Sequence, residues 1–295
     1  MKFPQKTLSF SGYLLKLKRS KSVSADKRSA SFSLAEKCGF LAFLSASLLL
    51  FISPYYSVIP LFIFLLLCFT SPFFPSFSFF LPIFSKAKNG ENGITLTFDD
   101  GPDPSSTPVI LGLLARYNLK ATFFIVGTRA EKFPWLIEDI LSQGHTIGNH
   151  SWDHDYFLML RSPKKLHENI HKAQKIFEKS GIQPYTFRPP IGITGSRLYN
   201  ALRKENLIAV NYSCRAFDRG NRNIVNLAAK ILGKIQPGDI IMLHDLPLPT
   251  KEQAVYWQKE LDHLFYQLTL NYPHTSLEKI LGQPVMTKVS EKATL

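Results

Sequence analysis

The chain has 295 residues, which is enough for one domain of about 200 residues together with a smaller segment. Lys and Arg outnumber Asp and Glu by 35 to 22, but residues 1–37 alone hold nine basic and two acidic side chains. The rest of the chain carries a net charge of only about +6, which argues against a nucleic-acid-binding face, and we expect no nucleic-acid partner. The three cysteines exclude a disulfide framework, because only Cys214 lies outside the apolar N-terminal region.

A long uncharged stretch, residues 38–85, follows the basic N-terminal arm and predicts a membrane segment. One straight helix of this length would measure about 72 Å, more than twice a hydrocarbon core of about 30 Å, so we expect one or two shorter spans. Pro54 and Pro60 bracket a segment with two tyrosines that suits a turn at the membrane interface. A buried helix pair in a soluble protein is the alternative interpretation.

The number of spans decides on which side of the membrane the rest of the chain lies. The basic arm, residues 1–37, is expected to stay in the cytoplasm. Two spans would return the following residues to the cytoplasm, and Lys86 and Lys88 agree with that arrangement. One span would place them outside. Because three prolines make the second half of the apolar stretch a poor span, we expect a membrane-anchored protein with its main domain outside the cytoplasm.

After a linker over residues 86–93, short apolar runs alternate with helical patterns, which predicts one α/β domain over 94–284 and a tail over 285–295. Strands separated by helices indicate a mostly parallel sheet. Six or seven strands favour an irregular (β/α) barrel over a doubly wound sheet. The expected strands cover residues 94–98, 121–126, 145–149, 185–188, 207–213 and 239–243, with the seventh after Pro273. Helices are expected to begin near Pro134, Pro163, Ser196 and Arg222.

Unusual polar clusters stand at or just beyond the carboxyl ends of most of these strands. They read TFDDGP, HSWDH, FRPPIG, AFDRG and LHD. Parallel α/β sheets and barrels build their sites where the carboxyl ends of their strands meet. We therefore expect the clusters to contribute to one site.

The adjacent Asp99 and Asp100 and the pair His150 and His154 form a pattern typical of a hydrolytic metal site. Neighbouring residues at a strand end point in different directions, so one carboxylate can hold a cation while the other faces the reactants. His150 and His154 are four residues apart, the spacing of two side chains on the same side of a helical turn. One carboxylate and two imidazoles leave positions open for water on zinc or a similar metal. Taken alone, the segment DDGP reads as a turn and a helix cap.

Three further polar residues fit the same site. Arg188 precedes two prolines at a strand end, and its guanidinium, which cannot lose its charge, can hold a carboxylate such as Asp99 in position. Asp218 is a plausible second partner for Arg188. His244 follows an apolar strand and is the natural general acid, because an imidazole can carry a proton near neutral pH. A core histidine satisfied by Asp245 is the alternative interpretation of His244.

These motifs, in their order along the chain, resemble those of polysaccharide deacetylases. TFDDGP, the run KATFFIVGTRAEKFPWLIEDILSQGHTIGNHSWDH, FRPPIG and LHD are similar to the motifs of the NodB homology domain, also called carbohydrate esterase family 4. The likeness covers residues 91–284, about two thirds of the chain. It implies a distorted (β/α) barrel that hydrolyses N-acetyl groups from amino sugars of a glycan such as peptidoglycan or a chitin-like oligomer, with a divalent metal ion as cofactor.

The resemblance also implies the chemical roles of the central residues. Asp100, His150 and His154 would bind the metal, which is most often zinc in this family. Asp99 would take a proton from the attacking water, and His244 would protonate the departing amine.

Supporting roles follow from the same resemblance. Arg188 would orient the base, with Asp218 behind it. The backbone N–H of Ile191 would help to hold the oxyanion, and Leu243 would line the pocket for the acetyl methyl group. This sequence departs from the family at Ile191, where an aromatic residue is usual, and at Arg219, where tryptophan is usual. The second departure removes an aromatic wall of the groove and puts the sugar preference in doubt.

One rival interpretation is a metalloprotease, because His167, Glu168 and His171 form a literal H-E-x-x-H motif. The two histidines lie about 100° away from the apolar stripe of their expected helix and stand among lysines. We therefore expect them to be solvated. A second rival is a carbohydrate-binding relative with weak or no catalysis, although such relatives usually lose a ligand or the base and this sequence keeps the whole set.

Overall fold

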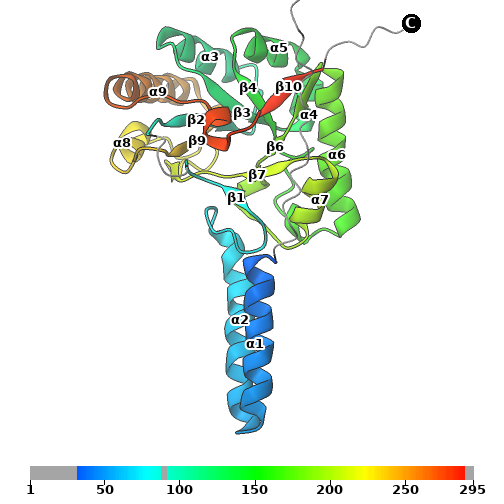
Figure 1. Ribbon diagram of the computed structural model, residues 1–295. Helices are drawn as coiled ribbons and strands as arrows, with labels where there is room; N and C mark the ends of the chain where they lie inside the picture. Colours follow the sequence, from blue (N-terminus) through cyan, green and yellow to red (C-terminus); the bar gives the residue numbers. More distant parts are fainter. Residues whose placement is uncertain (1–31, 88–91, 290–295) are drawn as a thin grey trace, which may run out of the picture. The chain divides into compact units, whose positions relative to one another are not determined.

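The structure is a computed structural model and describes residues 32–87 and 92–289 (Figure 1). Most of the basic arm expected over 1–37 lies outside the described residues, as do parts of the linker and of the C-terminal tail. The described residues form two N-terminal helices and an α/β domain.

The first helix, α1 (Leu34–Leu50), begins at a reciprocal cap. The Ser33 side-chain oxygen accepts a hydrogen bond from the backbone N–H of Glu36, and the Glu36 carboxylate accepts one from the backbone N–H of Ser33. This capping box satisfies two donors that a helix N-terminus otherwise leaves unpaired. The sequence therefore fixes where α1 starts.

The second helix, α2 (Pro54–Thr70), is capped by Ser53 and has Pro54 in its first turn. A proline in this position costs no helical hydrogen bond, because the first N–H groups of a helix have no partner inside the helix. The turn expected between Pro54 and Pro60 is wrong: the two helices are joined by residues 51–53, and Pro60 lies inside α2.

One helix among residues 32–87 and 92–289 is long and apolar enough to cross a membrane. It covers Pro54–Phe73, 20 residues with a mean hydropathy of 2.0, and almost none of it is buried. Phe62 and Phe69, for example, are 64% and 73% exposed. A helix with so many large apolar side chains exposed is suited to lipid rather than to water.

The last part of the expected membrane segment, residues 71–84, packs with the α/β domain instead. Phe79 is only 1% exposed. The short strand β1 (Ile83–Phe84) pairs in parallel with β7 (Ile208–Val210). Three prolines in this stretch interrupt a helix. Phe79 and Leu81 are buried, whereas Phe73, Phe74 and Phe77 remain exposed.

The domain is built on a sheet of eight parallel strands, in the order β1-β7-β6-β4-β3-β2-β9-β8. The two end strands do not pair with each other, so the sheet is an open, irregular barrel (Figure 1). A separate antiparallel pair joins β5 and β10. The remaining strands are β2 (Thr95–Asp99), β3 (Ala121–Ile125), β4 (Thr146–Asn149), β5 (Ile182–Pro184), β6 (Thr186–Phe187), β8 (Cys214–Arg215), β9 (Ile240–His244) and β10 (Met286–Lys288).

The predicted α/β class and irregular barrel are confirmed, and all six principal strands are present. The sheet has eight strands rather than six or seven, because β1 comes from the apolar segment and β8 is only two residues long. The strand expected after Pro273 is wrong. His274 makes a single bridge with Ile94, and the chain then forms α10 (Leu277–Leu281) before β10, which lies in the expected tail.

Helices surround the sheet (Figure 1). Those expected near Pro134 and Pro163 begin at these prolines, whereas those expected near Ser196 and Arg222 begin two and five residues later. The helices are α3 (Thr107–Arg116), α4 (Gly127–Lys132), α5 (Pro134–Ser142), α6 (Pro163–Lys179), α7 (Leu198–Lys204), α8 (Leu227–Leu232) and α9 (Lys251–Asn271).

The central strands are buried on both faces, since every residue of β2 and β3 is buried. Phe98 and Phe123 stack in the main core with ring centroids 5.1 Å apart, and Phe265 of α9 packs edge-on to Phe98. Such close packing allows little movement of the strands. The residues at the carboxyl ends of these strands are therefore held in fixed positions.

Candidate active site

Strand register brings residues from distant parts of the sequence together at one edge of the sheet. Asp99 at the end of β2 is paired with His244 at the end of β9. Paired residues on neighbouring strands extend to the same face of a sheet. The ends of β4 and β6 are also paired, which places the next residues, His150 and Arg188, side by side.

A cavity of about 550 Å³ lies at this edge of the sheet. All five polar clusters of the sequence contribute to its wall. The predicted site residues that line it are Asp99, Asp100, His150, His154, Ile191, Asp218 and His244. Arg188 is fully buried behind this wall.

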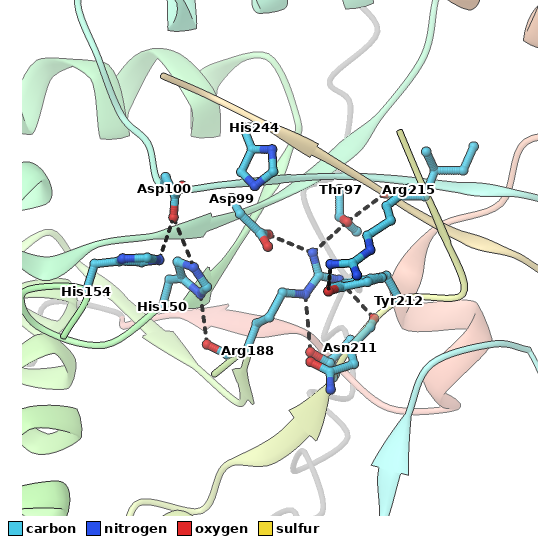
Figure 2. Close-up of polar contacts among 12 residues, drawn as sticks. Thr97, Asp99, Asp100, His150, His154, Arg188, Asn211, Tyr212, Arg215 and His244 are labelled. Carbon is cyan, nitrogen blue, oxygen red and sulfur yellow. Dashed lines mark hydrogen bonds and ion pairs between the residues drawn. The ribbon is translucent and has the colours of Figure 1, made fainter. Parts of the chain in front are cut away.

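Asp99 and Arg188 form a buried ion pair (Figure 2). Arg188 Nη1 lies 2.6 Å from Asp99 Oδ1, and the two side chains are 0% and 6% exposed. The guanidinium also donates to Thr97 Oγ1 at 2.8 Å and to the backbone carbonyls of Val210 and Asn211 at 3.2 and 3.0 Å. Because a buried guanidinium needs partners for its donors, this network fixes Arg188, and Arg188 in turn fixes one oxygen of Asp99.

Asp100, His150 and His154 converge on one point beside this pair (Figure 2). Asp100 Oδ1 lies 3.2 Å from His150 Nε2 and 2.9 Å from His154 Nε2, and the ligand atoms of all three lie within 4.8 Å of one another. Burial alone would raise the pKa of Asp100, but the two imidazoles outweigh it and hold the pKa well below its usual value. The carboxylate is therefore ionised, as cation binding requires.

The ring of His150 is oriented by the strand next to it. His150 Nδ1 lies 2.8 Å from the backbone carbonyl of Arg188, which leaves Nε2 facing Asp100. Metal-binding histidines typically use their second ring nitrogen in this way. The expectation that His150 and His154 share a helical turn is wrong: Ser151 and His154 have φ values of +70° and +54°, and a loop rather than a helix brings the imidazoles together.

His244 is paired with Asp218, whose Oδ2 lies 2.8 Å from His244 Nδ1. Burial alone would lower the pKa of the His244 imidazole, but the hydrogen bond and charge of Asp218, together with the charges of Asp100 and Asp99, raise it to about 9. The expectation that Asp218 pairs with Arg188 is therefore wrong. The loop after β8 carries Asp218 to the imidazole of β9, the strand that neighbours β8.

Asp245, the last residue of the LHD motif, anchors the loop that follows Asp100, a role that the sequence did not indicate. Its carboxylate accepts hydrogen bonds from Ser106 Oγ and Thr107 Oγ1, each at 2.6 Å. A Cβ atom at Gly101 would collide with the Asp245 side chain, so this position requires glycine. Asp245 is thus not the partner of His244.

The predicted place of Leu243 in the cavity wall is wrong. Leu243 is 1% exposed and belongs to the main hydrophobic core. Side chains alternate along a strand, so Met242 shares a face with His244 while Leu243 points the other way. Met242 and Leu246 are the apolar residues of this part of the cavity wall.

The mouth of the cavity is cationic and aromatic, which the sequence showed only in part. Arg215, Arg219 and Arg222 line it, and Arg215 donates to Tyr212 Oη at 2.9 Å. Phe217, 58% exposed, also lines the cavity, with the Arg215 guanidinium 4.2 Å from its ring centre. An aromatic surface therefore remains beside position 219, where the arginine replaces the usual tryptophan.

Comparison with known proteins agrees with this geometry. A sequence model described as polysaccharide deacetylase matches residues 86–210. A peptidoglycan-N-acetylglucosamine deacetylase of Bacillus cereus is 36% identical over 162 residues, which cover 54% of this chain and 76% of that protein. The enzyme PgdA of Listeria monocytogenes, also described as a peptidoglycan-N-acetylglucosamine deacetylase, is 37% identical over 167 residues, but they cover only 35% of its length and 56% of this chain.

A solved structure shares the fold. The crystal structure of the peptidoglycan N-acetylglucosamine deacetylase Bc1960 superimposes with a TM-score of 0.61 and 29% sequence identity. The match covers 69% of this chain and 94% of the other.

Proposed function

Because the chain belongs to the polysaccharide deacetylase family, the NodB-type enzymes of carbohydrate esterase family 4, we propose that its α/β domain removes acetyl groups from the N-acetylated sugars of peptidoglycan. The chain is accordingly a hydrolase that acts on amide bonds other than peptide bonds. The observation that carries the proposal is the meeting of three units in one cavity: the Asp99–Arg188 pair, the His244–Asp218 pair, and the cluster of Asp100, His150 and His154.

Asp100, His150 and His154 would hold a divalent cation, and we propose zinc. Among the described residues, Asp100 Oδ1 is buried without a hydrogen bond of acceptable geometry, although two imidazole nitrogens lie close to it. Three ligands directed at a common cation would have this arrangement, and one carboxylate with two imidazoles leaves coordination positions open. When bound, the cation would supply a Lewis acid that polarises the acetyl carbonyl and acidifies water.

Asp99 is the proposed general base and His244 the proposed general acid. Asp99, held by Arg188, accepts a proton from the attacking water, whose oxygen forms a bond to the acetyl carbon. His244, protonated below about pH 9, donates its proton to the nitrogen as the C–N bond breaks. The products are acetate and a free amino sugar.

Two parts of the cavity wall would position the acetyl group. We propose that the backbone N–H of Ile191 donates a hydrogen bond to the oxygen that gains negative charge. Met242, which faces the cavity in place of the predicted Leu243, would contact the methyl group.

The charge of the cavity mouth supports peptidoglycan over a neutral chitin-like oligomer as substrate, whereas the similar proteins include deacetylases of both kinds. Arg219 and Arg222 give the cavity mouth a positive charge, which suits a glycan that carries carboxylates.

We also propose that α2 anchors the enzyme in a membrane, with the domain on the extracytoplasmic side. The length, hydropathy and exposure of Pro54–Phe73 support anchoring. The backbone N–H of Ala35 in α1 donates to the carbonyl of Phe79, which lies beyond α2, so α1 and α2 form a hairpin and the start of α1 lies at the same end of α2 as the domain (Figure 1). A single span therefore does not separate the start of α1 from the domain, and the extracytoplasmic side is proposed because peptidoglycan lies outside the cytoplasmic membrane.

Acetate release by the full chain in detergent tests the proposed function. We expect release from peptidoglycan to exceed release from chitin-like oligomers, to stop after chelation and to return with zinc. A folded, metal-loaded chain that binds these glycans but releases acetate from none would favour the carbohydrate-binding relative instead.

Replacing Asp218 with Asn should move the alkaline limit of kcat to lower pH. The carboxylate of Asp218 stabilises protonated His244, so its loss lowers the pKa of the imidazole from about 9 toward its ordinary value of about 6.5. The acid form then disappears at a lower pH. A pH profile of kcat for both enzymes, loaded with the same metal, measures the change, and superimposable alkaline limbs would show that Asp218 does not set the proton affinity of His244.

A further inference from the structure

A second group of metal-ligating side chains lies on α6. His167 and His171 are one helical turn apart and both contact Glu205, the C-cap residue that follows α7. His167 Nε2 lies 2.6 Å from Glu205 Oε1, and His171 Nδ1 lies 3.1 Å from each oxygen of the same carboxylate. The expectation that these histidines are solvated holds for His171, whose side chain is 46% exposed, but His167 is only 28% exposed. Both contact Glu205, whose side chain is 13% exposed, which the sequence did not indicate.

The geometry of this group suits chelation. One ligand atom from each of the three residues lies within 4.8 Å of the other two. Ligands of a tetrahedral zinc ion lie about 3.4 Å apart when each bond is about 2.1 Å long. The 2.6 Å contact between His167 and Glu205 would need to lengthen by less than 1 Å, which partly exposed side chains can accommodate.

Three lysines of α6 have their short contacts with groups other than Glu205, although, besides the hydrogen bond to Glu178, the charge of Glu205 also contributes to raising the pKa of Lys175. Lys175 pairs with Glu178 at 2.7 Å, Lys164 lies 3.9 Å from Glu168, and the Lys172 ammonium sits 3.8 Å from the centre of the Trp152 ring. No lysine ion pair to Glu205 is present among the described residues. The carboxylate can therefore serve as an anionic ligand.

We propose that His167, His171 and Glu205 bind a second divalent transition-metal ion, such as zinc, at a site separate from the cavity. Imidazole nitrogen is a preferred ligand of such ions, and two imidazoles at this helical spacing with one carboxylate supply three ligands and leave a position for water. The assignment is to metal binding alone, not to proteolysis.

A cation at this position would join α6 to the end of α7. α6 also holds the loop that carries His154, because Asn169 accepts a hydrogen bond from the backbone N–H of Trp152 and donates one to Asp153, each at 2.8 Å. Helix α6 would thus provide two ligands for the second metal ion and also support the loop that carries His154, a ligand of the metal in the cavity. Metal binding should raise the thermal unfolding midpoint of the chain.

Metal stoichiometry tests the proposal on the full chain, purified without a polyhistidine tag, stripped with chelator and dialysed against zinc. The measurement starts from the variant His150→Ala/His154→Ala, which lacks two ligands of the cavity site, so that any zinc it binds must lie elsewhere. We expect this variant to bind one zinc ion and to gain thermal stability from it. Adding His167→Ala and His171→Ala should abolish both effects, whereas adding His263→Ala, an exposed histidine of α9, should change neither.

A milder variant keeps the test valid if the protein with four substitutions fails to fold. Glu205→Gln in the His150→Ala/His154→Ala background keeps both imidazoles and should weaken zinc binding and reduce the gain in the unfolding midpoint. Absence of zinc from the His150→Ala/His154→Ala variant would overturn the proposal, and so would zinc binding that is indifferent to His167, His171 and Glu205. Neither result would bear on deacetylation, so the two proposals can fail separately.

Discussion

Replacing Asp99 with Asn should lower kcat for deacetylation by about 100- to 10,000-fold, the usual contribution of a positioned general base. The amide keeps the size of the side chain but cannot accept the proton of the attacking water. Binding of glycan should change much less, because Asp99 is proposed to act on the water rather than on the sugar. Steady-state acetate release on peptidoglycan measures the effect.

The matched control for this variant is Ser105→Ala, which alters an exposed hydroxyl that bonds to Asp103 in the loop after Asp100. It should retain nearly full activity. Asp99→Asn protein that is folded, metal-loaded and as active as the natural chain would exclude Asp99 as the base. Circular dichroism and metal content, measured on the same samples, distinguish loss of chemistry from loss of structure.

Replacing Arg188 with Met should destabilise the domain by about 3–5 kcal/mol and abolish most activity. Arg188 is fully buried, and its removal leaves the Asp99 carboxylate without its 2.6 Å ion-pair partner, which is the costly way to break a buried pair. The carbonyls of Val210 and Asn211 also lose a donor. Urea unfolding of the full chain in detergent measures the change.

The double variant Asp99→Asn/Arg188→Met distinguishes the contribution of the ion pair to stability from the contribution of side-chain packing. Because it removes both charges, it should be more stable than Arg188→Met alone, and the two substitutions should not be additive. Strict additivity in the double-mutant cycle would mean that Asp99 and Arg188 do not interact across their short contact. Loss of activity should persist in the double variant, since the base is absent.

The main strands and their polar ends could be predicted from sequence because each strand is short, apolar and buried. β2 is buried along its whole length and is followed at once by Asp100, so the apolar run and the polar cluster meet at an unambiguous boundary. The convergence of such clusters then follows from parallel pairing alone. No side-chain detail is needed to predict that these residues lie at the same edge.

Other features depend on tertiary contacts that local sequence does not encode. Asp218 could reach either a guanidinium or an imidazole, and the course of the loop after β8 decides in favour of His244. The loop from His150 to His154 needs positive φ at non-glycine residues, which spacing cannot reveal. β1 is too short to stand out from the apolar segment before it.

The apolar residue that shares the cavity with His244 can be predicted from the sequence. If His244 faces the site, the two-residue period of a strand assigns residue 242, not residue 243, to the same face. The structure follows that rule, with Met242 at the cavity and Leu243 in the core. The second histidine pair, in contrast, could be recognised only when folding brought Glu205 to α6.

Anomalous diffraction at the zinc absorption edge, from crystals of the zinc-loaded protein, tests most directly whether Asp100, His150 and His154 share one cation beside Asp99. We expect a peak about 2.0–2.2 Å from an Asp100 carboxylate oxygen and from Nε2 of both histidines. An enzymatically active preparation whose crystals show no peak at these three side chains would contradict a shared metal site.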